Sequence, residues 1–108
     1  EPINSSMMNQ IIREIQERYT ENITLSGLAE AHGISTGYLS SQLKAELGLS
    51  FSKYVTSKRI QKAKKLLADE NLSVESIAEQ TGYKDYFYFI KVFKENTGIS
   101  PSKYRKNL

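Results

Sequence analysis

Apolar and polar residues alternate along this chain with the periodicity of α-helices. In the first segment Met8, Ile11, Ile12, Ile15 and Tyr19 fall at helical spacing and so form one apolar stripe. No segment alternates apolar and polar residues with a period of two, which disfavours winged-helix folds because these require a β-hairpin. The pattern therefore predicts an all-α fold of seven helices, over about residues 5–20, 25–32, 36–47, 50–69, 74–81, 86–97 and from 101 onward.

Small polar residues and glycines mark the ends of these helices. An oxygen on the side chain at the N-cap accepts hydrogen bonds from free N–H groups of the first turn, and glycine readily adopts the left-handed conformation that ends a helix. Pro101 suits the first position of the last helix. The expected N-caps are Thr24, Ser35, Ser50, Ser73, Asp85 and Ser100, and the expected helix ends are Gly33, Gly48, Gly82 and Gly98.

One helical unit occurs twice in the chain. The segment 25–54 recurs as 74–104, with an offset of 49 residues at Ala29 and of 50 residues from Tyr38 onward. The second copy therefore carries one extra residue in its turn. A constant offset with a single slip inside a loop indicates a duplicated structural unit. We expect a first subdomain over 1–49, a linker helix over 50–70 and a second subdomain over 71–108.

Each copy has the layout of a helix-turn-helix motif, in which a short helix and a tight turn present a second helix to the major groove of DNA. The residues spaced to face the core are Leu28, Leu39 and Leu43 in the first copy, and Ile77, Ala78, Gly82, Phe89 and Phe93 in the second. The residues expected to face outward are Thr36, Gly37, Ser40, Ser41 and Lys44, and in the second copy Tyr86, Phe87, Ile90, Lys91 and Lys94.

Basic residues are concentrated in two stretches. The net charge of the 108 residues is only +3, but residues 53–65 hold six basic residues and no acid, and residues 84–106 hold six against Asp85 and Glu95. Positive charge gathered beside the repeated helices is typical of a phosphate-binding face, although a solvated lysine-rich helix gives the same pattern. The candidate phosphate contacts are Lys44, Lys53, Lys58, Arg59, Lys94 and Lys103.

The composition of the chain excludes or disfavours several other kinds of protein and site. Cysteine is absent, which excludes disulfide scaffolds and thiolate metal sites. The lone histidine, His32, is expected to end a helix rather than bind a metal, and no cofactor, metal or catalytic residue is predicted. No apolar run approaches the roughly 18 residues of a membrane span, and no signal peptide is visible, so we expect a cytoplasmic protein. The chain starts at Glu1, directly before a helix signal, which suggests that an N-terminal regulatory domain lies outside it.

Residues 82–105 carry a specific motif, G-Y-x-D-x-x-Y-F-x-x-x-F-K-x-x-x-G-x-S-P-x-x-Y-R. This motif, together with the segment 38–67, resembles the tandem helix-turn-helix domain of the AraC/XylS family of bacterial transcription regulators. The resemblance covers nearly the whole chain. It implies two homeodomain-like subdomains joined by a long linker helix, sequence-specific binding to promoter DNA as activator or repressor, and contact with RNA polymerase in activators. In style the chain is similar to the C-terminal output domain of two-component response regulators of this family.

The positions that match the family's base-reading residues hold short or apolar side chains. Gly37, Ser40 and Ser41 stand where long polar residues are frequent, which removes bidentate readout but leaves serine hydroxyls able to bond a base edge. In the second copy Phe87 and Ile90 stand where small polar residues are common, so Lys91 is the obvious polar reader. The candidate base-reading residues are Thr36, Gly37, Ser40, Ser41, Tyr86, Phe87, Ile90 and Lys91.

The linker helix sets the scale of the predicted complex. About twenty residues give a helix near 30 Å long, close to the helical turn of B-DNA at about 34 Å, which favours a monomer that reads two successive major grooves. A helical protein-interaction module using the aromatic residues of the second copy remains the alternative, and Tyr86 and Phe87 suit groove contact and packing equally. An enzyme is disfavoured because no polar pocket is recognisable. Core positions with one polar tip are expected for Tyr38, Tyr54, Tyr83, Tyr88 and Tyr104.

Overall fold

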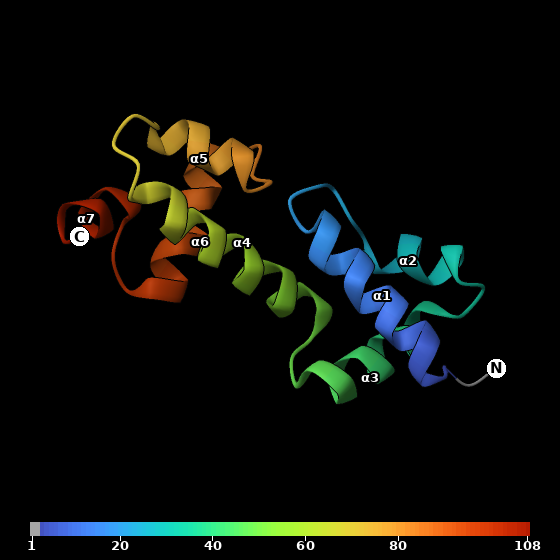
Figure 1. The fold of residues 1–108 in the computed structure, drawn as a ribbon. Helices are drawn as coiled ribbons and strands as arrows, with labels where there is room; N and C mark the ends of the chain where they lie inside the picture. Colours follow the sequence, from blue (N-terminus) through green and yellow to red (C-terminus); the bar gives the residue numbers. More distant parts are fainter. Residues whose placement is uncertain (1–2) are drawn as a thin grey trace. The chain divides into compact units, whose positions relative to one another are not determined.

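The computed structural model describes residues 3–108, which fold into seven α-helices with no β-strand in that range. This confirms the all-α prediction. The first two positions of the predicted subdomain over 1–49 lie outside the described residues. The helices are α1 (Ser5–Arg18), α2 (Leu25–Ala31), α3 (Thr36–Leu47), α4 (Phe51–Leu67), α5 (Val74–Gln80), α6 (Tyr86–Thr97) and α7 (Pro101–Lys106) (Figure 1).

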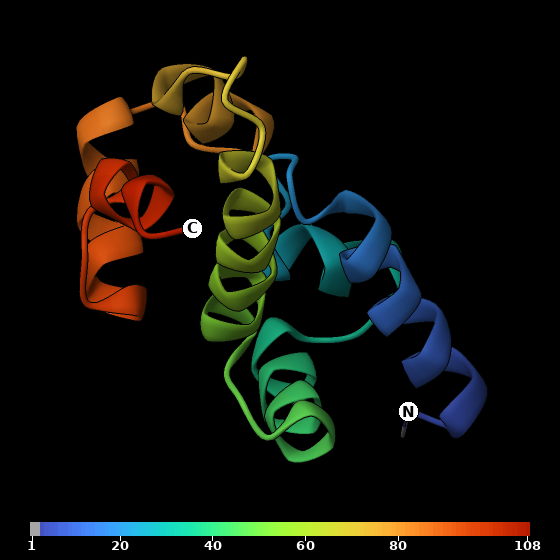
Figure 2. The same cartoon turned by 60° about the vertical axis from the view of Figure 1, so that its left-hand side comes forward.

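The chain divides into two compact units, and the division falls inside α4. The first unit ends at Thr56 and the second covers Ser57–Leu108. The α4 helix, drawn in green, continues through this point as one helix of 17 residues (Figure 2). It ends at Leu67, two residues before the predicted end, because Ala68 and Asp69 already form a turn with Lys65 and Leu66.

Local capping explains where the helices begin. The hydroxyl of Ser35 accepts a hydrogen bond from the Tyr38 N–H at 3.2 Å, and those of Thr24, Ser73 and Ser100 do the same for their own helices. Asp85 differs in kind, because its carboxylate accepts from the N–H groups of both Phe87 and Tyr88 at 2.9 and 3.2 Å. Every one of these caps was predicted.

The two helix-turn-helix turns are built alike. Gly33 and Gly82 have φ of +67° and +102°, a region that side chains resist. In each turn the residue after the glycine donates its N–H to an alanine carbonyl at the end of the preceding helix, from Ile34 to Ala29 at 3.0 Å and from Tyr83 to Ala78 at 2.9 Å. Four residues separate α2 from α3 and five separate α5 from α6, which confirms the extra residue in the second turn.

The core of the first unit is aliphatic. Three helices supply side chains that are fully or almost fully buried, and α4 adds Val55. The apolar stripe predicted for α1 is confirmed. The buried residues are Met8, Ile11, Ile15, Leu28, Ala29, Leu39, Leu43 and Val55.

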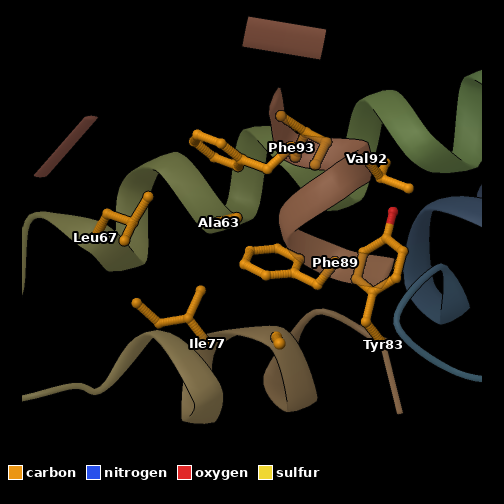
Figure 3. Close-up of a cluster of buried hydrophobic side chains, with 9 residues drawn as sticks. Ala63, Leu67, Ile77, Tyr83, Phe89, Val92 and Phe93 are labelled. Carbon is orange, nitrogen blue, oxygen red and sulfur yellow. The ribbon is translucent and has the colours of Figure 1, made fainter. Parts of the chain in front are cut away.

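The core of the second unit is aromatic where the first is aliphatic. Phe89 and Phe93 replace Leu39 and Leu43 and project from α6 toward Leu67 of α4 and Ile77 of α5 (Figure 3). The two phenyl rings lie 5.9 Å apart, within the range of favourable aromatic pairs. The buried residues are Ile60, Ala63, Leu67, Ile77, Ala78, Tyr83, Phe89, Val92 and Phe93.

Candidate nucleic-acid interface

The outer face of α3 presents small polar groups. Leu39 and Leu43 are fully buried on one side of this helix, and the 3.6-residue period therefore turns the opposite side to solvent. The predicted outward residues Thr36, Gly37, Ser40, Ser41 and Lys44 are all exposed. A Cβ built on Gly37 would meet no other atom within 4 Å. Among the described residues, nothing therefore covers α3 at Gly37.

The outer face of α6 is narrower than the sequence predicts. Phe87 is 78% exposed, and Lys91 and Lys94 are also exposed. Tyr86 and Ile90, expected to face outward, are instead half-buried and pack against the core of the second unit. The apolar face of α6 is wide because Val92 is buried as well as Phe89 and Phe93. Tyr86 and Ile90 lie at the edges of this face and are therefore partly buried.

Tyr88 was expected in the core but is 54% exposed. Its counterpart in the first copy, Tyr38, is half-buried and its hydroxyl accepts a hydrogen bond from the N–H of Ile3 at 3.2 Å. That donor comes from the segment before α1, which is not part of the repeat. The centroids of the Tyr88 and Tyr83 rings are 6.1 Å apart. Tyr88 is thus a second exposed aromatic side chain on α6, in addition to Phe87.

The two outward helices differ in the charge at their N-termini. The α3 helix is capped by the neutral hydroxyl of Ser35, whereas α6 is capped by the carboxylate of Asp85. A carboxylate at this end offsets the partial positive charge of the helix dipole and repels an incoming phosphate. The N-terminus of α6 is therefore less suited to bind an anion than the N-terminus of α3.

Four of the six candidate phosphate contacts have side chains that are exposed to solvent. These four are Lys44, Lys53, Lys94 and Lys103. Lys58 and Arg59 are half-buried, and the guanidinium carbon of Arg59 lies 5.2 Å from the centre of the Tyr83 ring. This distance suits a cation–π contact, so Arg59 stabilises the second unit whatever else it binds.

Two further arginines have partners within their own units. Arg18 donates to Glu14 and Glu21 at 2.9 and 3.1 Å, and the hydrogen bond with Glu21 raises its pKa. Arg105, counted above in the second basic stretch, donates to the backbone carbonyls of Leu67, Asp69 and Leu72. The neighbouring sequence does not predict these three contacts, because the partners of Arg105 lie far away along the chain.

Other kinds of site find little support in the described residues. No group of three or more His, Cys, Asp or Glu side chains in residues 3–108 is placed to hold a metal ion. His32 ends α2, as predicted, and its Nε2 lies 3.3 Å from a carboxylate oxygen of Glu14. No helix in the described part of the chain is long and apolar enough to cross a membrane.

Comparison with known families identifies the duplicated motif. A family model described as a helix-turn-helix domain matches residues 28–107, which include most of both motifs and all of α4. The chain belongs to the AraC-type helix-turn-helix family. This confirms the resemblance found in the sequence.

Curated relatives of this AraC-type domain are transcription regulators. The raffinose operon regulatory protein RafR of Pediococcus pentosaceus is 38% identical over 96% of this chain, and the activator Btr of Bacillus subtilis is 42% identical over 85% of it. The chain spans only 38% of RafR and 17% of Btr. It therefore corresponds to one domain of these longer proteins.

Solved structures agree with the AraC-type fold. The C-terminal domain of the response regulator yesN from Fusobacterium nucleatum has a TM-score of 0.87 and 42% identity, with 94% of this chain and 99% of that chain covered. The C-terminal domain of the response regulator AraT from Geobacillus stearothermophilus has a TM-score of 0.90 and 36% identity, with 96% and 87% covered. The DNA-binding domain of AdpA, solved with a target DNA, shares the fold at 20% identity, with a TM-score of 0.85 and 93% and 90% of the two chains covered. The chain is thus an AraC-type helix-turn-helix DNA-binding domain, of the kind that these transcription regulators carry.

Proposed function

We propose that this AraC-type domain binds duplex DNA as a monomer, with α3 in one major groove and α6 in the next. The observation that carries the proposal is the duplicated motif whose two second helices each turn exposed residues and a lysine to solvent. The 17 residues of α4 that join the copies give a helix about 25 Å long, somewhat shorter than predicted but still most of a B-DNA turn. A single chain would then read what many repressors read as dimers.

Within this proposal the residues divide into two groups. Thr36, Ser40 and Ser41 of α3, with Phe87 and Lys91 of α6, lie at positions to meet base edges. Tyr86 and Ile90 stay candidates only for contacts at the margin of the groove, because both pack against the core. Phosphate contacts from the exposed lysines would fix the register of the domain on DNA without reading sequence.

Footprinting on DNA sequences selected from a random pool tests the two-groove arrangement. We expect protection of two major-groove segments about one helical turn apart on the same side of the duplex. Ser41→Asp should remove protection of one segment and Lys91→Asp of the other, because each places a carboxylate in its own groove. Arg13→Glu, a charge reversal on the exposed side of α1, is the matched control and should change neither. Protection confined to one groove in the unaltered chain would refute the proposal.

The exposed aromatic side chains of α6 favour one alternative, a helical module that binds another protein. The two functions differ in their response to salt, because DNA binding releases counterions and binding through an apolar face does not.

We further infer that the domain works in the cytoplasm as part of a longer regulator, in which an N-terminal regulatory domain supplies the signal and RNA polymerase is a partner of activating forms. The small part of RafR and Btr that the chain spans supports this inference. Pull-down of RNA polymerase with the full-length regulator bound to its operator tests the polymerase contact.

A further inference from the structure

Phe87 is the most exposed large hydrophobic residue among those described, at 78% of its surface. It lies outside the core of the second unit, to which Phe89 and Phe93 on the same helix contribute. A phenyl ring left in water gains free energy when a partner covers it, by an amount proportional to the apolar area removed from solvent. Within residues 3–108 most of the Phe87 side chain is left uncovered.

The position of Phe87 is nevertheless well defined. Its ring packs edge-on against the ring of Tyr86, with centroids 5.5 Å apart, and Tyr86 is itself packed against the core. Its backbone N–H is held by the Asp85 carboxylate at 2.9 Å. The Tyr86 ring and the capped backbone therefore hold Phe87 in place at the first turn of α6. This turn is the part of a recognition helix that reaches the edges of the bases.

The surroundings of Phe87 favour DNA as the molecule that covers it. Lys84, Lys91 and Lys94 are exposed in the same stretch of the chain and match the charge of a phosphate backbone. In the major groove the C5 methyl group of thymine is the one apolar group that a base pair presents, and it distinguishes thymine from cytosine. A phenyl ring and a methyl group complement each other in this polar setting.

We propose that Phe87 recognises the C5 methyl group of a thymine, so that the half of the operator read by α6 requires a thymine that the half read by α3 does not. The inference rests on the proposed binding of α6 in a major groove. The counterpart of Phe87 in the first copy is Gly37, which has no side chain to make such a contact. The two copies therefore read DNA by different chemistry despite their common backbone.

The test replaces each thymine of a selected binding site, one at a time, by deoxyuridine, which lacks only the methyl group. One replacement in the half read by α6 should weaken binding of the unaltered 108-residue chain by about three- to fivefold, as expected for one buried methyl group. The same replacement should have no effect on Phe87→Ala. Cytosine at that position should weaken binding, and 5-methylcytosine should restore part of the affinity for the unaltered chain but none for Phe87→Ala.

Two further variants keep the result interpretable. Phe87→Leu keeps an apolar side chain and should retain part of the response to deoxyuridine, while circular dichroism checks that both Phe87 variants are folded. Leu108→Ala removes another exposed hydrophobic side chain, 67% exposed, from outside α6 and should behave like the unaltered chain.

Each contrary outcome has a distinct meaning. If Phe87→Ala weakens all sequences equally, the ring contacts the sugar-phosphate backbone and the thymine assignment is wrong. If the variant binds every DNA as the unaltered chain does but loses a protein partner in the cell, the aromatic face binds protein and the assignment is also wrong. If the unaltered chain enriches no sequence from the random pool, the proposed function itself fails.

Discussion

Among the described residues, no contact and no backbone conformation requires a glycine at Gly37. It is the second residue of α3, its φ is not positive, and a Cβ there would meet nothing within 4 Å. Glycine inside a helix is less stable than alanine by roughly 0.5–1 kcal/mol. The absence of a side chain at this position is explained if DNA comes closest to α3 there.

Gly37→Ala should therefore separate stability from binding. We expect the free energy of unfolding to rise by about 0.5 kcal/mol and the affinity for selected DNA to fall, because the added methyl group takes up space at the groove. Thermal melting and DNA titration measure the two effects. Ser26→Ala, at an exposed position of α2, should change stability slightly and affinity not at all. Unchanged affinity of Gly37→Ala would show that the groove lies elsewhere.

Lys91 and the serines of α3 should contribute differently to specificity. Lys91→Ala should relax base preference at one or two positions by roughly 1–3 kcal/mol, whereas Ser40→Ala and Ser41→Ala should each have little effect because water replaces a hydroxyl in a wet interface. Lys53→Ala and Lys103→Ala should weaken all sequences about equally. Titration against a panel of single-base changes decides the matter. Loss of discrimination in the serine variants, with Lys91→Ala unchanged, would reverse the assignment.

At the scale of elements, Arg105 closes the end of α4. Its Nε donates to the Leu67 carbonyl at 3.0 Å, and one terminal nitrogen donates to the carbonyls of Leu72 and Asp69 at 2.7 and 3.2 Å. The last carbonyls of a helix have no partner within it, so this side chain completes the C-terminus of α4 from α7. The planar guanidinium reaches all three oxygens at once, which a lysine ammonium does not reproduce.

Arg105→Met should lower the free energy of unfolding by roughly 1–3 kcal/mol, because it removes hydrogen bonds from a charged donor while keeping much of the apolar stem. Arg105→Lys should recover only part of the loss. Urea denaturation measures both, and Lys106→Met, an exposed neighbour, should stay within about 0.5 kcal/mol of the unaltered chain. Equal stability of Arg105→Met and Lys106→Met would contradict the structural role.

Comparison of the helix caps with Arg105 shows which contacts of this fold can be predicted from the sequence. Ser35 and Asp85 were assigned correctly because a capping oxygen and its N–H partner lie two or three residues apart. The partners of Arg105 lie 33 to 38 residues away, and periodicity carries no information about them. Tyr88 was misplaced for a related reason, since the repeat matched it to Tyr38, whose partner Ile3 lies outside the repeat.

For the whole molecule, the salt dependence of binding is the simplest measure of how much phosphate it contacts. Six candidate basic residues give a slope near −5 for the logarithm of the binding constant against the logarithm of salt concentration, at about 0.9 per phosphate on duplex DNA. Lys53→Ala should make this slope less negative by about one, because one phosphate contact is lost. Arg18→Ala should not change the slope, because Arg18 is paired with Glu14 and Glu21. A slope near zero would favour the protein-interaction alternative.

The partial burial of Tyr86 and Ile90 bears on how this regulator changes over evolutionary time. On α3 the four candidate readers are exposed, so we expect substitutions there to change DNA binding without disturbing the core. On α6 two of the four, Tyr86 and Ile90, pack against the core. Substitutions at these two positions are therefore expected to change the stability of the second unit as well as DNA binding. Under the proposed two-groove binding, operator sequences should therefore diverge faster in the half that α3 reads than in the half that α6 reads.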